Sequence, residues 1–290
     1  MIAYMLRNVR VSIILPYFER PDLLAASLRS FQTLYSASQV EVVIIDDASR
    51  FDLRPIFPHD FNLPIKLVTI VNKDGINPCT PINAGVRVAS GDLILLSSPE
   101  IVHTRSIFSS GVDTIPGKAE CWFYNVFAIT NLSINSELIK ANTHGDFMKI
   151  YSTFESDLNR DLGLNGYTWA NSFGSWYSHP IHRRTELNFL SLMQRDSFLR
   201  VGGFNERYRR GSGFDDNEFR RRMVTRGFSL KHLDSSPAIH LYHDEVSTRA
   251  NFNFGINSNE RLYNSRVMRL VPRKSIRKSY DFEVTELIPR

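Results

Sequence analysis

The first half of the chain alternates short apolar runs with a stretch of helical spacing. Four runs rich in Val, Ile and Leu have the length of strands, and they lie at residues 11–15, 40–45, 65–71 and 93–96. Residues 22–35 instead carry apolar side chains at helical spacing, namely Leu23, Leu24, Leu28 and Phe31. Strands that are apolar throughout are typical of a sheet covered on both faces, and their alternation with helices is typical of parallel pairing. The pattern predicts an α/β fold in which helices flank a mainly parallel central sheet.

The second half of the chain has a less regular pattern. Residues 121–129 and 188–193 have the composition of buried strands, whereas residues 131–178 are rich in Asn, Ser, Gly and aromatic residues. That composition is typical of a long surface loop, and long loops beside a rigid sheet often contact substrate. Two helices that end at glycine and two strands are expected beyond it, at residues 195–201, 215–226, 228–233 and 238–243.

The ends of the expected strands carry the first candidate chemistry, because ligands of open parallel sheets bind at the carboxyl ends of the strands. Asp46 and Asp47 follow the second strand, where they could accept hydrogen bonds from a nucleobase or ribose, or simply form a turn. Ser98 and Glu100 follow the fourth strand, where the carboxylate could hold a hard cation against a diphosphate, or lie in a proline turn. The turn at residues 16–21 contains no glycine, which argues against a dinucleotide-binding enzyme.

A cluster of acids follows a glycine-rich approach in the sequence GSGFDDNEF, residues 211–219. Asp215, Asp216 and Glu218 lie at the start of the helix expected there. Acids in a first turn complement the helix dipole, and Asp215 could be the N-cap. Alternatively, one carboxylate takes a proton from an attacking hydroxyl, which requires burial and the neighbouring acid to raise a pKa that the dipole lowers.

His240 and His243 are candidate metal ligands near the end of the last expected strand. Side chains three positions apart in a strand point to opposite faces, so both could ligate one ion only if the strand had already ended. We expect one of the two to be a ligand and the other to be a packed histidine.

Charge and cysteine content narrow the class of protein. The 290 residues carry a net charge of +5, from 35 basic and 30 acidic residues. Six basic residues in the stretch 266–278 account for this excess, since the remainder of the chain sums to 29 − 30 = −1. The run is either solvated or a peripheral contact with anionic lipid, and no nucleic-acid-binding motif accompanies it. Two cysteines, no signal sequence and no long apolar run predict free thiols and a cytoplasmic location.

Taken together, these motifs resemble inverting glycosyltransferases of the GT-A fold, family two and its close relatives. The opening VSIILPYFERPDLLAASLRSF (residues 11–31) is similar to that family's first strand and helix, and VEVVIIDDAS (40–49) to its nucleotide-binding strand end. Residues 77–100 resemble the stretch that leads into the metal motif. Residues 195–223 resemble the acceptor-side segment of galactosyl- and N-acetylgalactosaminyl-transferases. The likeness covers about residues 11–244.

The resemblance implies roles for individual residues. Those implied at the nucleotide sugar are Pro16, Tyr17, Glu19, Asp46, Asp47, Asn83 and Ser98. The family's Asp-x-Asp motif falls on Ser98-Pro99-Glu100, so that only Glu100 keeps a carboxylate for the metal, with His243 and, second, His240. Asp215 and Asp216 match the acidic pair that orients and deprotonates the acceptor, and Trp176 and Tyr177 are implied acceptor contacts.

The implied activity is metal-dependent transfer of a sugar, with inversion, from a nucleotide diphosphate sugar to a glycan hydroxyl. The donor is expected to be uridine-linked, the metal to be Mn²⁺ or Mg²⁺, and Asp216 to be the general base. The alternatives are a catalytically degenerate protein that binds nucleotide or glycan, and a sugar nucleotidyltransferase. Within one GT-A domain, residues 1–100 are expected to bind the donor and residues 101–250 the acceptor, followed by a basic extension at 251–290.

Overall fold

The computed structural model describes residues 10–50, 52–57, 61–71, 74–109, 115–157, 173–243, 258–265 and 282–287. The basic run at 266–278 lies outside these residues, so the expected lipid contact remains a prediction. None of the helices in the described part of the chain has both the length and the apolar character needed to cross a membrane.

Four parallel strands form the first half of the sheet, as the sequence predicts. They are β1 (Val11–Tyr17), β2 (Val40–Asp46), β3 (Ile65–Ile70) and β4 (Leu93–Ser97), and they lie side by side in the order β3-β2-β1-β4. The helices α2 (Pro21–Leu34) and α3 (Cys79–Val88) make the connections β1 to β2 and β3 to β4. The carboxyl ends of β1, β2 and β4 therefore meet at one edge of the sheet.

The second half of the sheet has mixed pairing. Its strands are β5 (Ile101–His103), β6 (Glu120–Ile129), β7 (Gly174–Ser178), β8 (Leu190–Gln194), β9 (Ser229–His240) and β10 (Phe282–Leu287). The full order is β10-β3-β2-β1-β4-β8-β6-β9-β5, with β7 paired to β6. Only β6 and β9 are parallel to each other here; the remaining pairs are antiparallel. Strand β10 places part of the expected C-terminal extension at the edge of the sheet.

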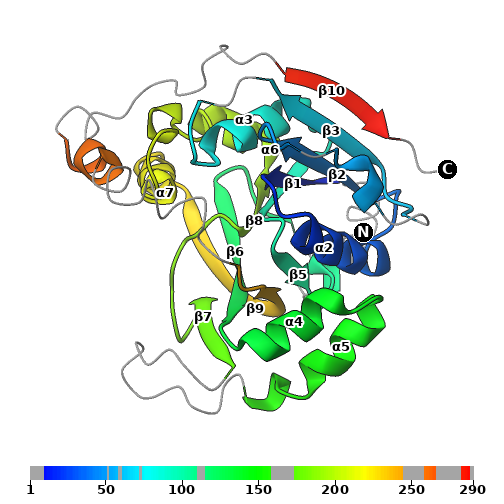
Figure 1. Ribbon diagram of the computed structural model, residues 1–290. Helices are drawn as coiled ribbons and strands as arrows, with labels where there is room; N and C mark the ends of the chain where they lie inside the picture. The colour runs from blue at the N-terminus through cyan, green and yellow to red at the C-terminus, as the bar shows by residue number, and fades with distance from the viewer. Residues whose placement is uncertain are drawn as a thin grey trace, which may run out of the picture.

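Helices cover both faces of this sheet (Figure 1). Ile13 and Leu15 of β1 pack against Leu24 and Phe31 of α2, whereas Ile14 between them packs into the cluster on the opposite face. That opposite cluster also receives apolar side chains of α3, α6 (Arg195–Val201) and α7 (Asp215–Thr225). The alternation of side chains along β1 therefore feeds two cores, and the α/β fold with a flanked central sheet is confirmed.

Two expectations for the second half were wrong. Residues 131–178 are not one long surface loop, because they contain α4 (Leu132–Lys140), α5 (His144–Ser152) and β7. Asn131 begins α4 by accepting hydrogen bonds from the backbone of the first turn, and Thr143 and Asp146 form a capping box at α5. Residues 228–243 are not two strands either, since β9 runs through most of them as one strand with a register shift opposite Tyr124 and Val126 of β6.

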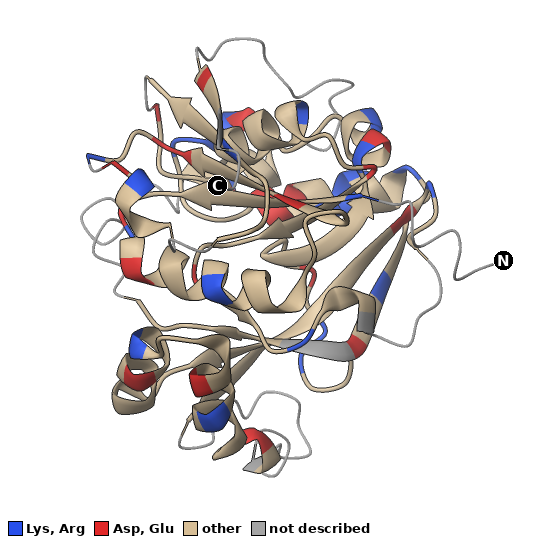
Figure 2. Cartoon of the chain, turned by 90° about the vertical axis from the view of Figure 1, so that its right-hand side faces the viewer, with Lys and Arg blue, Asp and Glu red and all other residues tan. Residues whose placement is uncertain are grey.

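The remaining described helical turns are short. They are the 3-10 turns η1 (Arg54–Ile56), η2 (Ile107–Ser109), η3 (Glu155–Asp157) and η4 (Glu206–Tyr208), and a helical turn at residues 258–264. Cys79 and Cys121 are buried free cysteines, as expected. Basic and acidic side chains are interspersed along the helices on the side of the molecule drawn in Figure 2.

Candidate active site

A cavity of about 590 Å³ opens where the strand ends meet the start of α7. Its walls come from six separate parts of the chain: the end of β1 with the turn after it, Asp47 after β2, residues 76–81 before and within α3, the turn after β4, residues 212–216, and His243 after β9. Glu100, Asp216 and His243, which lie far apart in sequence, all line it. A volume of this size is in the range of small-molecule sites. The structure therefore brings together in one cavity residues that the resemblance implied for the metal ion and for the acceptor.

Four of the residues implied for the nucleotide line this cavity: Pro16, Tyr17, Asp47 and Ser98. The phenol oxygen of Tyr17 is buried without a hydrogen-bond partner, and burial raises the pKa of Tyr17 to about 12. A neutral phenol of this kind can both donate to and accept from a ligand. The backbone N–H of Asp47 donates to the carbonyl oxygen of Tyr17 over 2.9 Å, which joins the ends of β1 and β2.

Three other residues implied for the nucleotide are not among those that line the cavity: Glu19, Asp46 and Asn83. Glu19 accepts two hydrogen bonds from Arg50, at 2.6 and 2.9 Å. Asp46 accepts from the backbone of Ser49 at 2.9 Å and so forms the turn that was the alternative interpretation of the Asp-Asp sequence. Asn83 is buried in α3 and donates to the Phe204 carbonyl at 2.9 Å. A contact of these three side chains with the nucleotide remains a prediction.

Glu100, His240 and His243 form a cluster that can hold a metal ion. One ligand atom from each of the three lies within 4.8 Å of the others, and the Nε2 atom of each histidine is 3.5 Å from Oε1 of Glu100. Strand β9 ends at His240, so His243 is free of the strand's alternation and turns toward the same carboxylate. Both histidines thus lie beside Glu100 because the strand end lies between them, although only His243 lines the cavity, and which of the two would be a metal ligand remains a prediction.

The cluster has the chemistry that a divalent cation requires. Oxygen and imidazole ligands suit Mn²⁺ and Mg²⁺. Burial alone would raise the pKa of Glu100, but contacts with His240 and His243 and the charge of Arg20 hold it well below its usual range. Oε2 of Glu100 and Nδ1 of His243 are buried and have no hydrogen-bond partner among the residues that the structure describes. The residues fit a metal ion that also takes oxygen ligands from a bound diphosphate.

The acidic pair begins α7 at the opposite wall. Gly213 and Phe214 both have left-handed backbone, with φ of +67° and +65°, and they turn the chain sharply into the helix. Asp215 accepts a hydrogen bond from Nδ2 of Asn77 at 2.8 Å, and Asp216 accepts from Nδ2 of Asn188 at 2.7 Å. Both carboxylates are thus held in place by amide donors while they line the cavity.

Burial changes the protonation of this pair. Burial, followed by the charge of Asp215, raises the pKa of Asp216 to about 7, although bonds from Asn188 lower it. Burial also raises the pKa of Asp215, against the bond from Asn77. A carboxylate with a pKa close to neutral can accept a proton more readily than an ordinary aspartate, so Asp216 has the property required of a general base.

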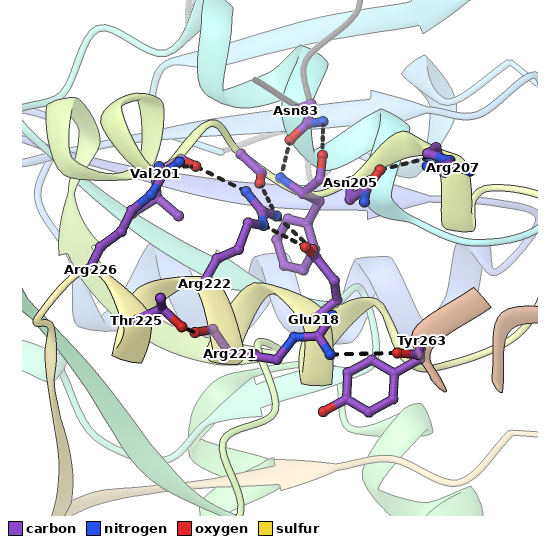
Figure 3. Close-up of polar contacts among 12 residues, drawn as sticks. Asn83, Val201, Asn205, Arg207, Glu218, Arg221, Arg222, Thr225, Arg226 and Tyr263 are labelled. Carbon is purple, nitrogen blue, oxygen red and sulfur yellow. Dashed lines mark hydrogen bonds and ion pairs between the residues drawn. The ribbon is translucent and has the colours of Figure 1, made fainter. Parts of the chain in front are cut away.

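A buried ion pair anchors α7 beneath this wall (Figure 3). Arg222 donates to Glu218 at 2.7 and 2.8 Å, to the Val201 carbonyl at 2.9 Å and to the Gly203 carbonyl at 2.6 Å. Both charged side chains are almost completely buried. Arg222 is therefore a buried arginine, whereas Arg220 on the same helix is exposed. The i, i+4 spacing of Glu218 and Arg222 was the available signal.

We expect Arg222→Ala to lower the free energy of unfolding by about 3–5 kcal/mol, because it leaves Glu218 buried without its counter-charge. Urea unfolding followed by circular dichroism measures this loss. The matched control is Arg220→Ala on the same helix, whose side chain is 48% exposed and pairs with Glu186. The control should change stability by less than about 1 kcal/mol. Equal losses for the two variants would contradict a structural role for the buried pair.

The two aromatic residues implied for the acceptor occupy different environments. Trp176 packs edge-on against Phe127 at 5.2 Å between ring centroids and belongs to the core cluster around α4 and α5. Tyr177 is partly buried and contacts the ring of His240 at 4.8 Å. Neither is among the residues that line the cavity. Acceptor contact by either residue remains a prediction, with Tyr177 nearer to the metal-ligating cluster.

Sequence patterns did not indicate three residues that complete the site. Asn77 and Asn188 hold the acidic pair, and lone asparagines in loops carry no motif of their own. Arg20 lines the cavity and places Nη1 3.4 Å from Oε1 of Glu100 and 3.2 Å from Nε2 of His243. Its position directly after the first strand was the only available signal.

Two family models each match a segment of the chain that contributes residues to this cavity. Residues 12–103 match the model of glycosyl transferase family 2, and residues 178–244 match that of the N-terminal domain of galactosyltransferase. The first segment contains Tyr17, Arg20 and Glu100, and the second contains Asp216 and His243. The two matched segments are thus similar to parts of two glycosyltransferase families. No curated protein sequence matches the chain closely enough to be related on that ground.

Solved structures of glycosyltransferases confirm the GT-A fold of this chain. GalNAc-T7, crystallised with UDP, GalNAc and Mn²⁺, superposes with a TM-score of 0.55 and 15% identity, covering 82% of this chain and 44% of that one. TarS of S. aureus, crystallised with UDP-GlcNAc, superposes with a TM-score of 0.53 and 13% identity, covering 82% of this chain and 61% of that one. This chain therefore spans only part of the length of each.

Proposed function

We propose that this glycosyltransferase moves a sugar from a UDP-sugar to a hydroxyl group of a glycan, with inversion at the anomeric carbon. The observation that carries the proposal is the position of Asp216, Glu100 and His243 on the walls of one cavity, with His240 completing the cluster around Glu100. The cluster suits the diphosphate end of a donor, and Asp216 suits the hydroxyl of an acceptor. The bound UDP of GalNAc-T7 and the UDP-GlcNAc of TarS support the choice of uridine.

The proposed reaction is a single displacement. The acceptor oxygen forms a bond to the anomeric carbon as the bond from that carbon to the β-phosphate oxygen breaks, and Asp216 takes the acceptor's proton. Asp215, fixed by Asn77, orients the acceptor. Attack from one side and departure from the other invert the configuration. Glu100, His240 and His243 would hold Mn²⁺ or Mg²⁺, which when bound neutralises negative charge on the leaving diphosphate.

The direct test is a thermal-shift screen of nucleotide sugars in the presence of Mn²⁺. A ligand that binds only the folded state raises the melting temperature, by an amount that grows with its concentration above Kd. We expect UDP-sugars to stabilise the protein more than GDP-sugars, and EDTA to remove the stabilisation. The stabilising donor is then incubated with oligosaccharide acceptors, and UDP release is measured.

Three results would contradict the proposal in different ways. Stabilisation by UDP-sugars without any UDP release would favour a degenerate binding protein. Release of pyrophosphate from UTP and a sugar phosphate would favour a nucleotidyltransferase. Stabilisation that EDTA leaves unchanged would show that the cluster needs no metal ion.

A further inference from the structure

The positively charged guanidinium group of Arg20 lies against Glu100 and His243, where it would oppose the binding of a metal ion. Its guanidinium group enters the cavity from the turn after β1 and reaches both Glu100 and His243. It is the N-cap residue of α2 but makes no side-chain capping bond there. The described contacts of its charged end therefore belong to the metal-ligating cluster rather than to the helix.

Arg20 occupies the lone pair of His243 through which that histidine would bind a metal ion. Arginine carries only N–H donors and keeps its charge at all ordinary pH values. At 3.2 Å from Nε2 of His243, the Nη1 group can therefore only donate to the lone pair of that nitrogen. A metal ion would bind through that same lone pair. The contact with Oε1 of Glu100 at 3.4 Å engages the carboxylate oxygen that also faces both histidines.

The charges around the cluster also oppose the binding of a metal ion. Glu100 is the only carboxylate of the three-residue cluster, and Arg20 already balances its charge. A divalent cation placed there would lie within a few ångströms of a fixed positive charge, with neutral imidazoles as its other protein ligands. At such distances the repulsion between the two positive charges disfavours binding of the cation, because a partly buried site screens charges less than bulk water does. The cluster without nucleotide is thus poorly suited to hold a metal ion.

A diphosphate removes both obstacles. Its oxygens match the planar fork of a guanidinium group, so Arg20 can exchange Glu100 and His243 for phosphate. That exchange frees the lone pairs of Oε1 and Nε2 and brings negative charge beside the cluster. The diphosphate also supplies oxygen ligands that a lone carboxylate lacks.

We propose that Arg20 is a positioning residue that makes binding of the metal ion depend on binding of the nucleotide diphosphate. The inference rests on the proposed function, because it takes the donor to be a nucleotide diphosphate sugar. By linkage, a nucleotide that strengthens metal binding is itself bound more tightly by the same factor when metal is present. Removing the charge of Arg20 should uncouple the two ligands.

The experiment is a titration with Mn²⁺ alone, followed by electron paramagnetic resonance of the free ion. We expect wild type to bind Mn²⁺ weakly without nucleotide, and Arg20→Gln to bind it at least tenfold more tightly. A second titration measures the affinity for UDP with and without Mn²⁺. Mn²⁺ should strengthen UDP binding by a large factor in wild type and by a much smaller factor in Arg20→Gln.

Two further variants separate charge from structure. Arg50→Gln is the matched control, because Arg50 is exposed and pairs with Glu19 away from the cavity lining. It should behave as wild type in both titrations. Arg20→Lys keeps the positive charge and should keep Mn²⁺ binding weak without nucleotide. Circular dichroism and melting temperature confirm that each variant is folded.

The outcomes distinguish this inference from the proposed function. If Arg20→Gln binds Mn²⁺ no more tightly than wild type, while UDP and Mn²⁺ still enhance each other, competition by Arg20 is overturned and the metal site stands. Weaker UDP binding with unchanged Mn²⁺ binding would make Arg20 a simple phosphate ligand, which also overturns it. If neither protein binds Mn²⁺ with or without UDP, the metal site of the proposed function fails as well.

Discussion

Asp216→Asn is expected to lower kcat by roughly 10²–10⁴-fold, the range typical for loss of a general base. The amide is nearly the same size as the carboxylate, so the cavity and the affinity for UDP should be unchanged, while proton transfer from the acceptor is lost. Single-turnover measurements of UDP release, with UDP affinity measured in parallel, test both parts. Asn217→Ala changes the exposed neighbour on the same helix and should be nearly neutral. Near-normal turnover by Asp216→Asn would contradict the assignment.

The raised pKa of Asp216 gives this prediction a pH dependence. A base works when it is deprotonated, so kcat/KM of wild type should rise with pH through about 7. The same shift affects stability in the opposite direction. A carboxyl group with a raised folded-state pKa destabilises the fold above that pKa, and the penalty disappears below the pKa of the unfolded chain. Asp216→Asn should therefore melt at a higher temperature than wild type at pH 8, and the difference should shrink toward pH 4.

Glu100→Gln is expected to weaken Mn²⁺ binding in the presence of UDP by at least about 100-fold. Loss of a residue that only hydrogen-bonds to a metal ligand typically lowers metal affinity by about 10–100-fold. Glu100 is the sole carboxylate of the cluster, so its loss should have a larger effect. UDP affinity should then become almost insensitive to Mn²⁺, and turnover should fall to a trace. Isothermal titration with UDP at increasing Mn²⁺ concentrations measures the effect.

A matched carboxylate variant controls for this change. Glu19→Gln removes the same charge from the turn after β1, where Glu19 pairs with Arg50 outside the residues that line the cavity. It should leave the Mn²⁺ dependence of UDP binding intact. Equal Mn²⁺ dependence in wild type and Glu100→Gln would show that Glu100 is not a ligand.

The donor half of the fold could be predicted because its strands are buried on both faces. Such strands are apolar at most positions on both faces, and the runs at 11–15 and 40–45 lie within β1 and β2. The amphipathic helices α4 and α5 were missed because polar and aromatic residues between apolar positions resemble loop composition. Their capping signals, Asn131 and the Thr143–Asp146 box, were present in the sequence and were more informative than its overall composition.

The site could be predicted only where a strand end or a helix start carried the reactive group. Glu100 and His243 were identified at strand ends and Asp216 at the start of a helix, and the structure places all three on the cavity. Whether His240 and His243 converge depends on the residue at which β9 ends, which alternation cannot fix within two or three positions. Asn188 and Arg20 were missed because their roles arise from contacts between segments more than 20 residues apart.

The most direct measurement is a crystal structure with UDP and Mn²⁺, using anomalous scattering to locate the metal ion. We predict one manganese peak in contact with Glu100, His240, His243 and oxygens of the diphosphate. We also predict that Arg20 moves from His243 to the phosphate. Asp216 should face the open end of the same cavity, on the side where a sugar would extend. UDP bound elsewhere, or manganese bound without contact to Glu100, would contradict the account.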